Sequence, residues 1–212
     1  GGSVIVIEGV PFLSGCEHRV IPDRIVAATY LAAAAATGSD LLLHQVRPAH
    51  LSLVLPVFEE AGCILKAQGD QLQIRSPRRL RPVHIVRTMP YPGFPTDAQA
   101  PVMAMTCVAD GSSMFVENIF ESRYKHAGEL LRLGASIKVE GRVAVVEGVP
   151  RLSGAPVQAP DLRGGAALVV AALAAEGVSQ VSGLEHIRRG YEGLEAQLSA
   201  LGGKIQLHTE ET

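Results

Sequence analysis

An internal repeat constrains the fold of this 212-residue chain more than any other feature of its sequence. The run Ile7-Glu-Gly-Val-Pro-Phe-Leu-Ser-Gly15 returns 139 residues later as Val146-Glu-Gly-Val-Pro-Arg-Leu-Ser-Gly154, with two positions changed. A second marker is a glycine that follows an amphipathic run and precedes a short run of alternating apolar and polar residues. It occurs at Gly62, Gly134 and Gly202, and the spacings between these glycines are 72 and 68 residues. Both markers agree on a unit of about 70 residues. The sequence therefore predicts three repeated units, at about 4–68, 70–140 and 142–208.

Each unit shows the same order of patterns: a strand, a proline-rich turn, an apolar helix, a strand, an amphipathic helix and two more strands. We expect the apolar helices at 23–37, 98–109 and 163–175, and the amphipathic helices at 51–61, 126–133 and 191–201. The clearest strands are predicted at 4–7, 41–44, 64–66, 114–117, 137–139, 180–182 and 205–207.

The first helix of each unit has no polar face. The runs 27–36 and 166–173 consist almost wholly of alanine and larger apolar residues. A helix that is apolar all round is buried all round, and alanine lets helices approach closely. Three such helices must pack against one another, so the sheets have to lie outside them. We predict one α/β domain over residues 1–212, an inside-out α/β barrel with pseudo-threefold symmetry.

Composition excludes several classes of function. The net charge of −2 and pI of about 6.4 argue against nucleic acid or a membrane surface as the main partner. The longest apolar stretch, 25–37, is too short to cross a bilayer. The three cysteines are widely spaced and lack a CxxC pair, which predicts reduced thiols and a cytoplasmic protein. The seven histidines show no metal-ligand spacing, so we expect neither a metal nor a cofactor.

The segment that leads into the second apolar helix is unusually stiff. Three prolines and a glycine stand in the run 90–95, which has little conformational freedom to lose. We expect Pro101 in the first turn of the helix, which places Asp97 at or just ahead of the helix N-terminus. An isolated aspartate there is most often a helix cap. Because a cap does not need so stiff an approach, we favour a loop that aims Asp97 at a ligand or reacting group.

Six motifs stand in order along nearly the whole chain: Arg19-Val-Ile-Pro-Asp-Arg24, Pro92-Gly-Phe-Pro-Thr-Asp-Ala-Gln-Ala-Pro101, Glu117-Asn-Ile-Phe-Glu-Ser-Arg123, Leu152-Ser-Gly-Ala155, Asp161-Leu-Arg163 and His186-Ile-Arg-Arg-Gly-Tyr-Glu192. Together they resemble the enolpyruvyl transferases, and within that family the branch that acts on UDP-N-acetylglucosamine. The resemblance covers the C-terminal half of such an enzyme. It implies that an N-terminal domain is missing from this chain, and the start without methionine also leads us to expect a part of a longer protein.

The resemblance implies transfer of an enolpyruvyl group from phosphoenolpyruvate to the 3-hydroxyl of UDP-N-acetylglucosamine, a step of peptidoglycan synthesis. An alcohol is a poor nucleophile, and the resemblance gives Asp97 the role of accepting its proton. Arginine forks suit the carboxylate and phosphate of phosphoenolpyruvate, and the matching residues are Arg123, Arg163 and Arg189. The family also implies a backbone contact to the nucleotide sugar at Ile119 and a hinge loop at Asp23 and Arg24, where an N-cap and a surface ion pair are the ordinary alternative.

Two other functions stay open. The shikimate-pathway enolpyruvyl transferase shares the fold and an arginine-rich cleft, although the motifs around Asp97 and Arg189 fit the sugar-nucleotide branch better. A non-catalytic repeat domain is the third possibility. With one wall of the cleft missing, we expect the chain alone to be inactive. In the family an N-terminal segment supplies a strand to this domain, so we expect residues 4–7 to fill the vacancy, within the chain or by exchange with a second copy.

Overall fold

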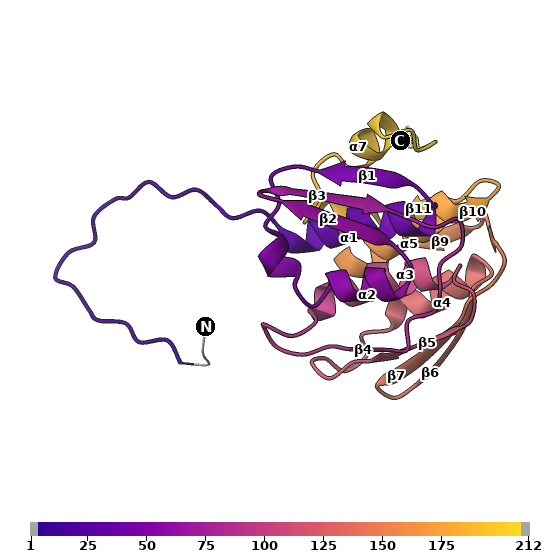
Figure 1. Cartoon of the computed structure of the whole chain (residues 1–212), viewed down its shortest axis with the longest axis horizontal. Coiled ribbons are helices and arrows are strands. Elements are labelled where there is room, and N and C mark those ends of the chain that lie inside the picture. Colours follow the sequence, from indigo (N-terminus) through magenta and orange to yellow (C-terminus); the bar gives the residue numbers. More distant parts are fainter. Residues whose placement is uncertain (1–3, 209–212) are drawn as a thin grey trace.

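Three buried helices form the centre of the protein. The structure is a computed structural model, and it describes residues 4–208. The central helices are in contact in all three pairs, and sheets lie around them (Figure 1). They are α1 (Arg24–Ala36), α3 (Thr96–Thr106) and α5 (Leu162–Ala174). Most of their residues are buried, which confirms the helical core predicted from the alanine-rich runs.

The helix starts follow local chemistry. The Asp23 carboxylate caps α1, with Oδ1 2.7 Å from the backbone nitrogen of Ile25. Asp161 caps α5 through the nitrogen of Gly164, at 2.8 Å. In α3 the N-cap residue is Pro95, and its side chain makes no capping bond. Pro101 lies in the interior of α3 rather than in its first turn, so that prediction was wrong. Because proline has no N–H, one carbonyl of the first turn is left without its helical partner.

Two sheets, one antiparallel and one mixed, cover opposite sides of this core (Figure 1). The first has the order β1-β3-β2, made of β1 (Asp40–Leu43), β2 (Ile64–Gln68) and β3 (Gln71–Arg75). The second has the order β4-β5-β7-β6, made of β4 (Ile85–Arg87), β5 (Ser112–Val116), β6 (Ser136–Glu140) and β7 (Val143–Glu147). In this second sheet β4 is parallel to β5, whereas the other pairs are antiparallel. Alternate side chains of β3 and β7 are fully buried against the helices.

The third unit contains two short parallel pairs instead of a complete sheet. One joins β8 (Leu152–Ser153) to β10 (Ala175–Glu176), and the other joins β9 (Pro156–Gln158) to β11 (Gln180–Ser182). The strand predicted at 205–207 is not formed: residues 203–208 are irregular. Within residues 4–208 the sheets thus surround the three central helices, and their strands do not close into a barrel.

Two of the three predicted amphipathic helices are shorter than predicted: α2 (Leu55–Glu60), which a 3-10 turn (Pro48–Leu51) precedes, and α7 (Leu194–Ala200). The third, α4 (Lys125–Arg132), has the predicted length and begins one residue earlier, and a short helix that was not predicted, α6 (Leu184–Arg188), precedes α7. The three repeat-marking glycines end α2, α4 and α7 with φ of +97°, +87° and +96°. In this left-handed region glycine is the preferred residue. The glycine marker is therefore a helix-stop signal, as the sequence indicated.

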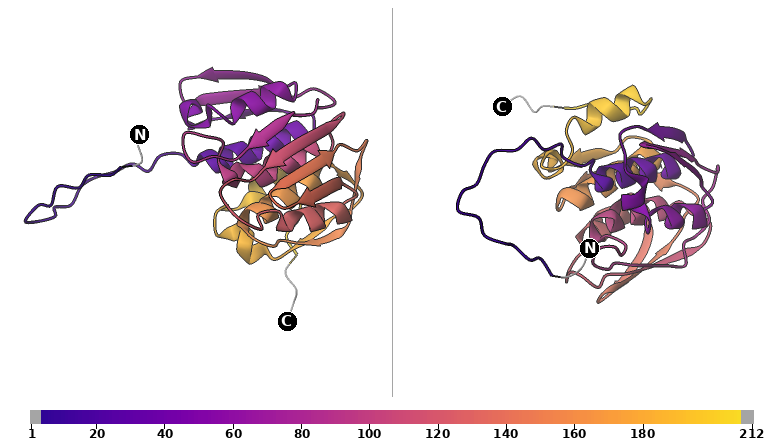
Figure 2. Two further views of the ribbon diagram at one scale, coloured as in Figure 1. Left: turned by 90° about the horizontal axis from the view of Figure 1, so that it is seen from below. Right: turned by 60° about the vertical axis from the view of Figure 1, so that its left-hand side comes forward.

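The N-terminal segment does not form the predicted strand. Residues 4–22, which we call the arm, project from the body in every view (Figures 1 and 2). The side chains of Val4 to Ile7 are 78–85% exposed. The strand predicted at 4–7 was thus wrong for the single chain, because a strand exists only where another strand supplies its hydrogen-bond partners.

No helix within residues 4–208 is both long enough and apolar enough to cross a lipid bilayer.

Candidate functional site

The first turns of the central helices meet at one end of the core. Asp97 in the first turn of α3 contacts Arg163 in the first turn of α5. The guanidinium of Arg24, at the start of α1, lies 5.1 Å from the ring centre of Tyr91 in the loop before α3. Helix N-termini carry unpaired N–H groups and a partial positive charge. This end of the core therefore favours anions.

The carboxylate of Asp97 lies between two arginines. Its Oδ1 is 2.7 Å from Nη2 of Arg123, and its Oδ2 is 3.1 Å from Nη2 of Arg163. The side chain of Asp97 is 39% exposed, whereas those of Arg123 and Arg163 are 20% and 13% exposed. Asp97 forms no capping bond. The structure thus brings together three of the residues that the sequence singled out, from three distant motifs.

The approach to Asp97 is a tightly closed turn. The nitrogen of Met89 donates to the carbonyl of Phe94 at 2.9 Å, and the nitrogen of Gly93 donates to Pro90 at 2.7 Å. A Cβ at Gly93 would lie 2.4 Å from the Cβ of Met89, so no side chain fits there. The turn fixes the chain immediately before α3. This is the rigid support for Asp97 that the proline-rich run predicted.

A buried carboxylate that the sequence analysis gave no role, Glu117, holds the other side of the site. Its Oε1 accepts hydrogen bonds from the backbone nitrogens of Ile119 and Phe120, at 2.8 and 3.0 Å. Its Oε2 accepts from the hydroxyl of Thr96 at 2.8 Å. One side chain, 1% exposed, thus fixes the 117–120 loop to the first residue of α3. The signal in the sequence was an acidic residue directly after an apolar strand.

The loop held by Glu117 leads to Arg123. The guanidinium carbon of Arg123 lies 5.4 Å from the ring centre of Phe120, a cation–π distance. Arg123 is therefore placed from two sides, by this ring and by Asp97. The nitrogen of Ile119 is already bonded to Glu117, so a ligand contact at Ile119 would have to use another atom.

Tyr191 positions the second arginine. Nη1 of Arg163 is 3.4 Å from its hydroxyl, and the guanidinium carbon is 5.8 Å from its ring centre. The same hydroxyl is 2.8 Å from that of Thr29 on α1. Burial raises the pKa of Tyr191, although Thr29 and Arg163 oppose that shift. Tyr191 therefore stays a neutral phenol that links α1 to α5, a contact that the sequence analysis did not predict.

Three other predicted site residues stand apart from the Asp97 cluster. Asp23 caps α1, which is the ordinary alternative for that residue. Arg24 stacks on Tyr91 and makes no ion pair within residues 4–208. Arg189 follows α6 with an exposed side chain, and its guanidinium forms no hydrogen bond or ion pair with another residue of 4–208. A Cβ at Gly190 would lie 2.9 Å from Leu162, so the backbone beside Arg189 packs onto the start of α5.

Among residues 4–208, no group of three or more His, Cys, Asp or Glu side chains is arranged to hold a metal ion. Cys63 and Cys107 are buried, and burial raises the pKa of Cys107 to about 12. A thiol with so high a pKa is a poor nucleophile at neutral pH. The charged groups that contact one another at this end of the core are the Asp97 carboxylate and the guanidinium groups of Arg123 and Arg163.

Known proteins similar to this chain carry the names of enolpyruvyl-transferring enzymes. Residues 1–198 match the family model described as EPSP synthase (3-phosphoshikimate 1-carboxyvinyltransferase). Over 206 residues the chain is 52% identical to a UDP-N-acetylglucosamine 1-carboxyvinyltransferase of Desulfofundulus thermocisternus, covering 97% of this chain and 84% of that protein. It is 49% identical to UDP-N-acetylglucosamine 1-carboxyvinyltransferase 2 of Caldanaerobacter subterraneus subsp. tengcongensis, covering 97% of this chain and 49% of that protein.

A solved structure is also similar. The enolpyruvyl transferase NikO from Streptomyces tendae superposes with a TM-score of 0.79 at 28% identity, over 88% of this chain and 44% of that protein. The chain therefore spans about half the length of NikO and of the Caldanaerobacter relative, and most of the length of the Desulfofundulus relative.

Proposed function

We propose a function from one premise: this chain belongs to the enolpyruvyl transferase family that the EPSP synthase model describes. The proposed role is to supply the C-terminal domain of an enzyme that transfers an enolpyruvyl group from phosphoenolpyruvate to the 3-hydroxyl of UDP-N-acetylglucosamine. The observation that carries the proposal is the carboxylate of Asp97, held between Arg123 and Arg163 at the helix N-termini. The names of the relatives that are about half identical to this chain favour this substrate over shikimate 3-phosphate.

In the proposed reaction the sugar oxygen bonds to the central carbon of phosphoenolpyruvate and the methylene carbon gains a proton. The resulting tetrahedral intermediate then loses inorganic phosphate and a proton, which restores the carbon–carbon double bond. Asp97 accepts the proton of the hydroxyl, since a positioned base makes an alcohol a better nucleophile. Arg123 and Arg163 neutralise the carboxylate and phosphate charges.

Both oxygens of Asp97 already accept an arginine hydrogen bond in the unliganded protein. The carboxylate and phosphate of phosphoenolpyruvate compete for the same guanidinium groups. As an arginine turns from Asp97 to the substrate anion, it releases a carboxylate oxygen that can accept the proton of the sugar. Binding of phosphoenolpyruvate is thus coupled to the availability of the base.

The remaining residues have supporting roles in this proposal. Arg189, exposed beside the start of α5, reaches substrate anions across the cleft. Ile119 contacts the nucleotide sugar through the loop that Glu117 holds. Asp23 and Arg24 lie where the arm enters α1, which suits a hinge toward the second domain of a full-length enzyme. The proposed setting is peptidoglycan precursor synthesis in the cytoplasm.

The test is calorimetry on a full-length protein that carries this chain. UDP-N-acetylglucosamine should bind, and shikimate 3-phosphate should not. The reverse preference would assign the chain to the shikimate branch. Binding of neither ligand, with an intact fold, would favour a non-catalytic repeat domain and overturn the proposal.

A further inference from the structure

We propose that Tyr191 is a positioning residue that holds Arg163 by Nη1, so that only Nη2 exchanges between Asp97 and a substrate anion. This inference rests on the proposed function, in which Arg163 binds an anionic group of phosphoenolpyruvate. It starts from the two ends of one guanidinium: Nη2 is 3.1 Å from Oδ2 of Asp97, and Nη1 is 3.4 Å from the hydroxyl of Tyr191. The guanidinium carbon also lies 5.8 Å from the tyrosine ring centre. The two terminal nitrogens of Arg163 therefore have different partners.

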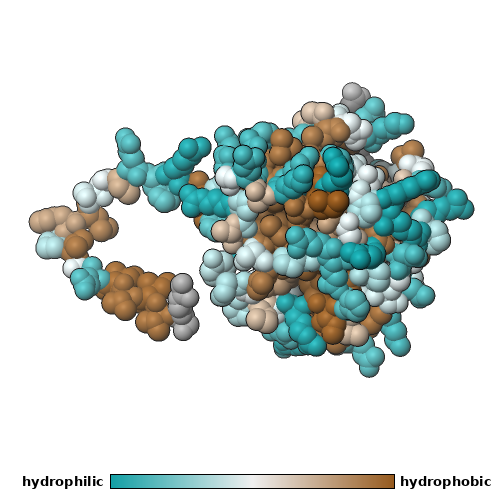
Figure 3. Space-filling view, viewed as in Figure 1, coloured by the Kyte–Doolittle hydropathy of each residue, from teal (hydrophilic) through white to brown (hydrophobic). Residues whose placement is uncertain are grey.

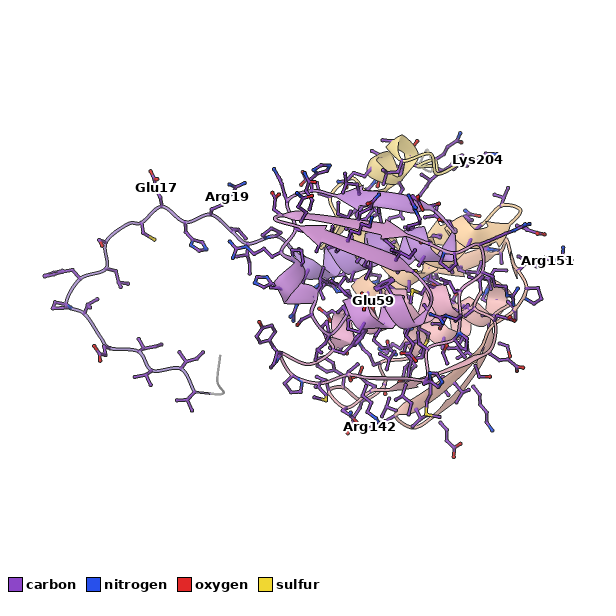
Figure 4. The ribbon with its side chains drawn as sticks, in the orientation of Figure 1. Glu17, Arg19, Glu59, Arg142, Arg151 and Lys204 are labelled. Atoms are coloured by element: carbon purple, nitrogen blue, oxygen red, sulfur yellow. The ribbon has the colours of Figure 1, made fainter. Side chains whose placement is uncertain are left out.

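Arg163 is much more confined than arginines at the surface. Arg142 and Arg151 lie at the outside of the body (Figure 4), and 49% and 70% of their side chains are exposed. The side chain of Arg163 is 13% exposed. A buried guanidinium needs partners for its N–H groups, because little water reaches them. The protein groups around Arg163 therefore decide which way it faces.

The hydrogen bonds behind Tyr191 run in one direction. Arginine can only donate, so the hydroxyl oxygen of Tyr191 accepts from Arg163. The hydroxyl of Thr29 donates its one proton to the carbonyl of Ile25, at 2.9 Å. The same hydroxyl is therefore left to accept from the hydroxyl of Tyr191, 2.8 Å away. The donors thus lead from Arg163 through Tyr191 and Thr29 to the backbone of α1.

This hydrogen-bonded chain is anchored inside the core. Hydrophilic residues cover much of the visible surface of the body (Figure 3), whereas Thr29 and Tyr191 are both buried. The carbonyl that ends the chain belongs to the first turn of α1 and moves only with that helix. Hydrogen bonds in such a series strengthen one another where water is excluded. Tyr191 is therefore a fixed partner of Arg163, and the half-exposed Asp97 is the partner that can be exchanged.

Holding one nitrogen gives the exchange a defined geometry. When an anionic group of phosphoenolpyruvate takes the place of the Asp97 carboxylate, the guanidinium needs only to turn about its contact with Tyr191. A guanidinium without that contact would have more side-chain freedom to lose on binding, and the anion would bind more weakly. Tyr191 thus acts on phosphoenolpyruvate through Arg163.

The first experiment measures steady-state kinetics in a full-length protein that carries this chain. Tyr191→Phe keeps the ring and removes the hydroxyl, so KM for phosphoenolpyruvate should rise by about three- to tenfold, with a smaller change in kcat. Tyr30→Phe is the matched control, because Tyr30 is also buried and its hydroxyl donates to Gln197 at 2.6 Å instead of contacting an arginine. Its KM should stay at the parent value. An unchanged KM in Tyr191→Phe, or an equal rise in both variants, overturns the proposal.

Thr29→Val separates positioning from stability. Valine has nearly the shape of threonine and cannot accept a hydrogen bond, so the Tyr191 hydroxyl loses its acceptor but can still accept from Arg163. Urea unfolding should show a loss of stability in Thr29→Val, whereas KM for phosphoenolpyruvate should rise less than in Tyr191→Phe. A KM that follows the loss of stability in the Thr29, Tyr30 and Tyr191 variants alike would show a merely structural role and overturn the proposal.

Nuclear magnetic resonance tests the anchor without an enzymatic assay. In the 212-residue chain with isotopically labelled arginine, exchange between the two Nη sites reports rotation of each guanidinium, and Arg163→Lys assigns the signals. Rotation should be slower in Arg163 than in Arg142, and Tyr191→Phe should speed it up while Tyr30→Phe should not. Equal rotation of Arg163 in the parent chain and in Tyr191→Phe overturns the anchor, whatever the activity of the full-length protein. Slow rotation that depends on Tyr191, in a parent protein without turnover, would establish the anchor and refute the proposed function.

Discussion

Arg163 and Asp97 form an ion pair, with Nη2 3.1 Å from Oδ2, that joins the first turns of α5 and α3. Both belong to helices that are apolar along most of their length, so charge is concentrated where these helices begin. Arg123 adds a second contact to the same carboxylate, at 2.7 Å. The apolar helices thus fix the positions of the charged groups, and the charges face the end of the core that is accessible to solvent.

The role of Asp97 as base predicts a selective loss of turnover. In a full-length protein that carries this chain, Asp97→Asn keeps the size of the side chain and removes its ability to accept a proton. Turnover should fall by about two to four orders of magnitude, while binding of UDP-N-acetylglucosamine changes little. Steady-state kinetics and calorimetry measure the two effects. Turnover near the wild-type value would refute the assignment of the base.

Replacement of Arg163 should have a different signature. Arg163→Gln removes the charge that the proposal assigns to capture of phosphoenolpyruvate, so KM for phosphoenolpyruvate should rise by about tenfold or more. The variant Arg163→Lys should recover only part of this loss, because an ammonium group cannot make the bidentate contact. Equal KM values in all three proteins would exclude a contact between Arg163 and this substrate.

Glu117 predicts an effect on stability that the 212-residue chain itself can report. Glu117→Ala leaves the nitrogens of Ile119 and Phe120 without their acceptor and should lower the free energy of unfolding by about 2 kcal/mol or more. Glu117→Gln should cost less, because an amide oxygen still accepts from both. Urea unfolding followed by circular dichroism measures the change.

Glu121 offers a matched control in the same loop. Its carboxylate is 87% exposed and forms an ion pair with Arg142 at 3.4 Å. Such surface pairs contribute little, so Glu121→Ala should change the free energy of unfolding by less than about 1 kcal/mol. If Glu117→Ala and Glu121→Ala lower the free energy of unfolding equally, the buried hydrogen bonds of Glu117 do not stabilise the fold more than the exposed ion pair of Glu121 does.

How far the sequence predicts this molecule depends on whether a feature is local. The alanine-rich runs predicted the buried helices because a helix without a polar face can only be buried. The stiff turn before Asp97 could also be predicted, because the prolines and the glycine that form it are neighbours in the sequence. The partners of Asp97 come from motifs 26 and 66 residues away, and only the family resemblance suggested that they meet. The predicted strands at 4–7 and 205–207 failed because strand formation depends on a neighbouring strand that the local sequence does not supply.

The proposal that a second domain completes the catalytic cleft predicts that this chain alone has no transferase activity. Catalysis of this kind needs substrates held in one geometry and water kept away from the reacting atoms. The Asp97 side chain is 39% exposed, so this half does not exclude water by itself. An assay of phosphate release from phosphoenolpyruvate and UDP-N-acetylglucosamine should give the background rate, with a full-length protein as positive control. Release above background would show that one domain suffices.

His126 predicts a loss of stability in mild acid. The imidazole is 1% exposed on α4, and its Nε2 has no hydrogen-bond partner within residues 4–208. Burial lowers its pKa from 6.5 to about 4; the charge of Asp161 opposes this shift, and that of Arg123 adds to it. The folded state therefore binds this proton less readily than the unfolded state does. The contribution of neutral His126 to stability is fully present above pH 6.5 and is lost as the pH falls toward 4, with a slope of up to about 1.4 kcal/mol per pH unit.

Comparison with His126→Phe isolates this contribution from that of the carboxylates, which also titrate at the lower end of the range. Phenylalanine keeps an aromatic ring and takes up no proton, so the variant should lose less stability between pH 6.5 and 4.5 than the parent chain does. Urea unfolding at half-unit pH intervals gives the two slopes. The difference between them, rather than either absolute stability, is the informative quantity, because the larger ring can strain the contact with the start of α5. Parallel slopes would mean that His126 is protonated as readily in the folded chain as in the unfolded one.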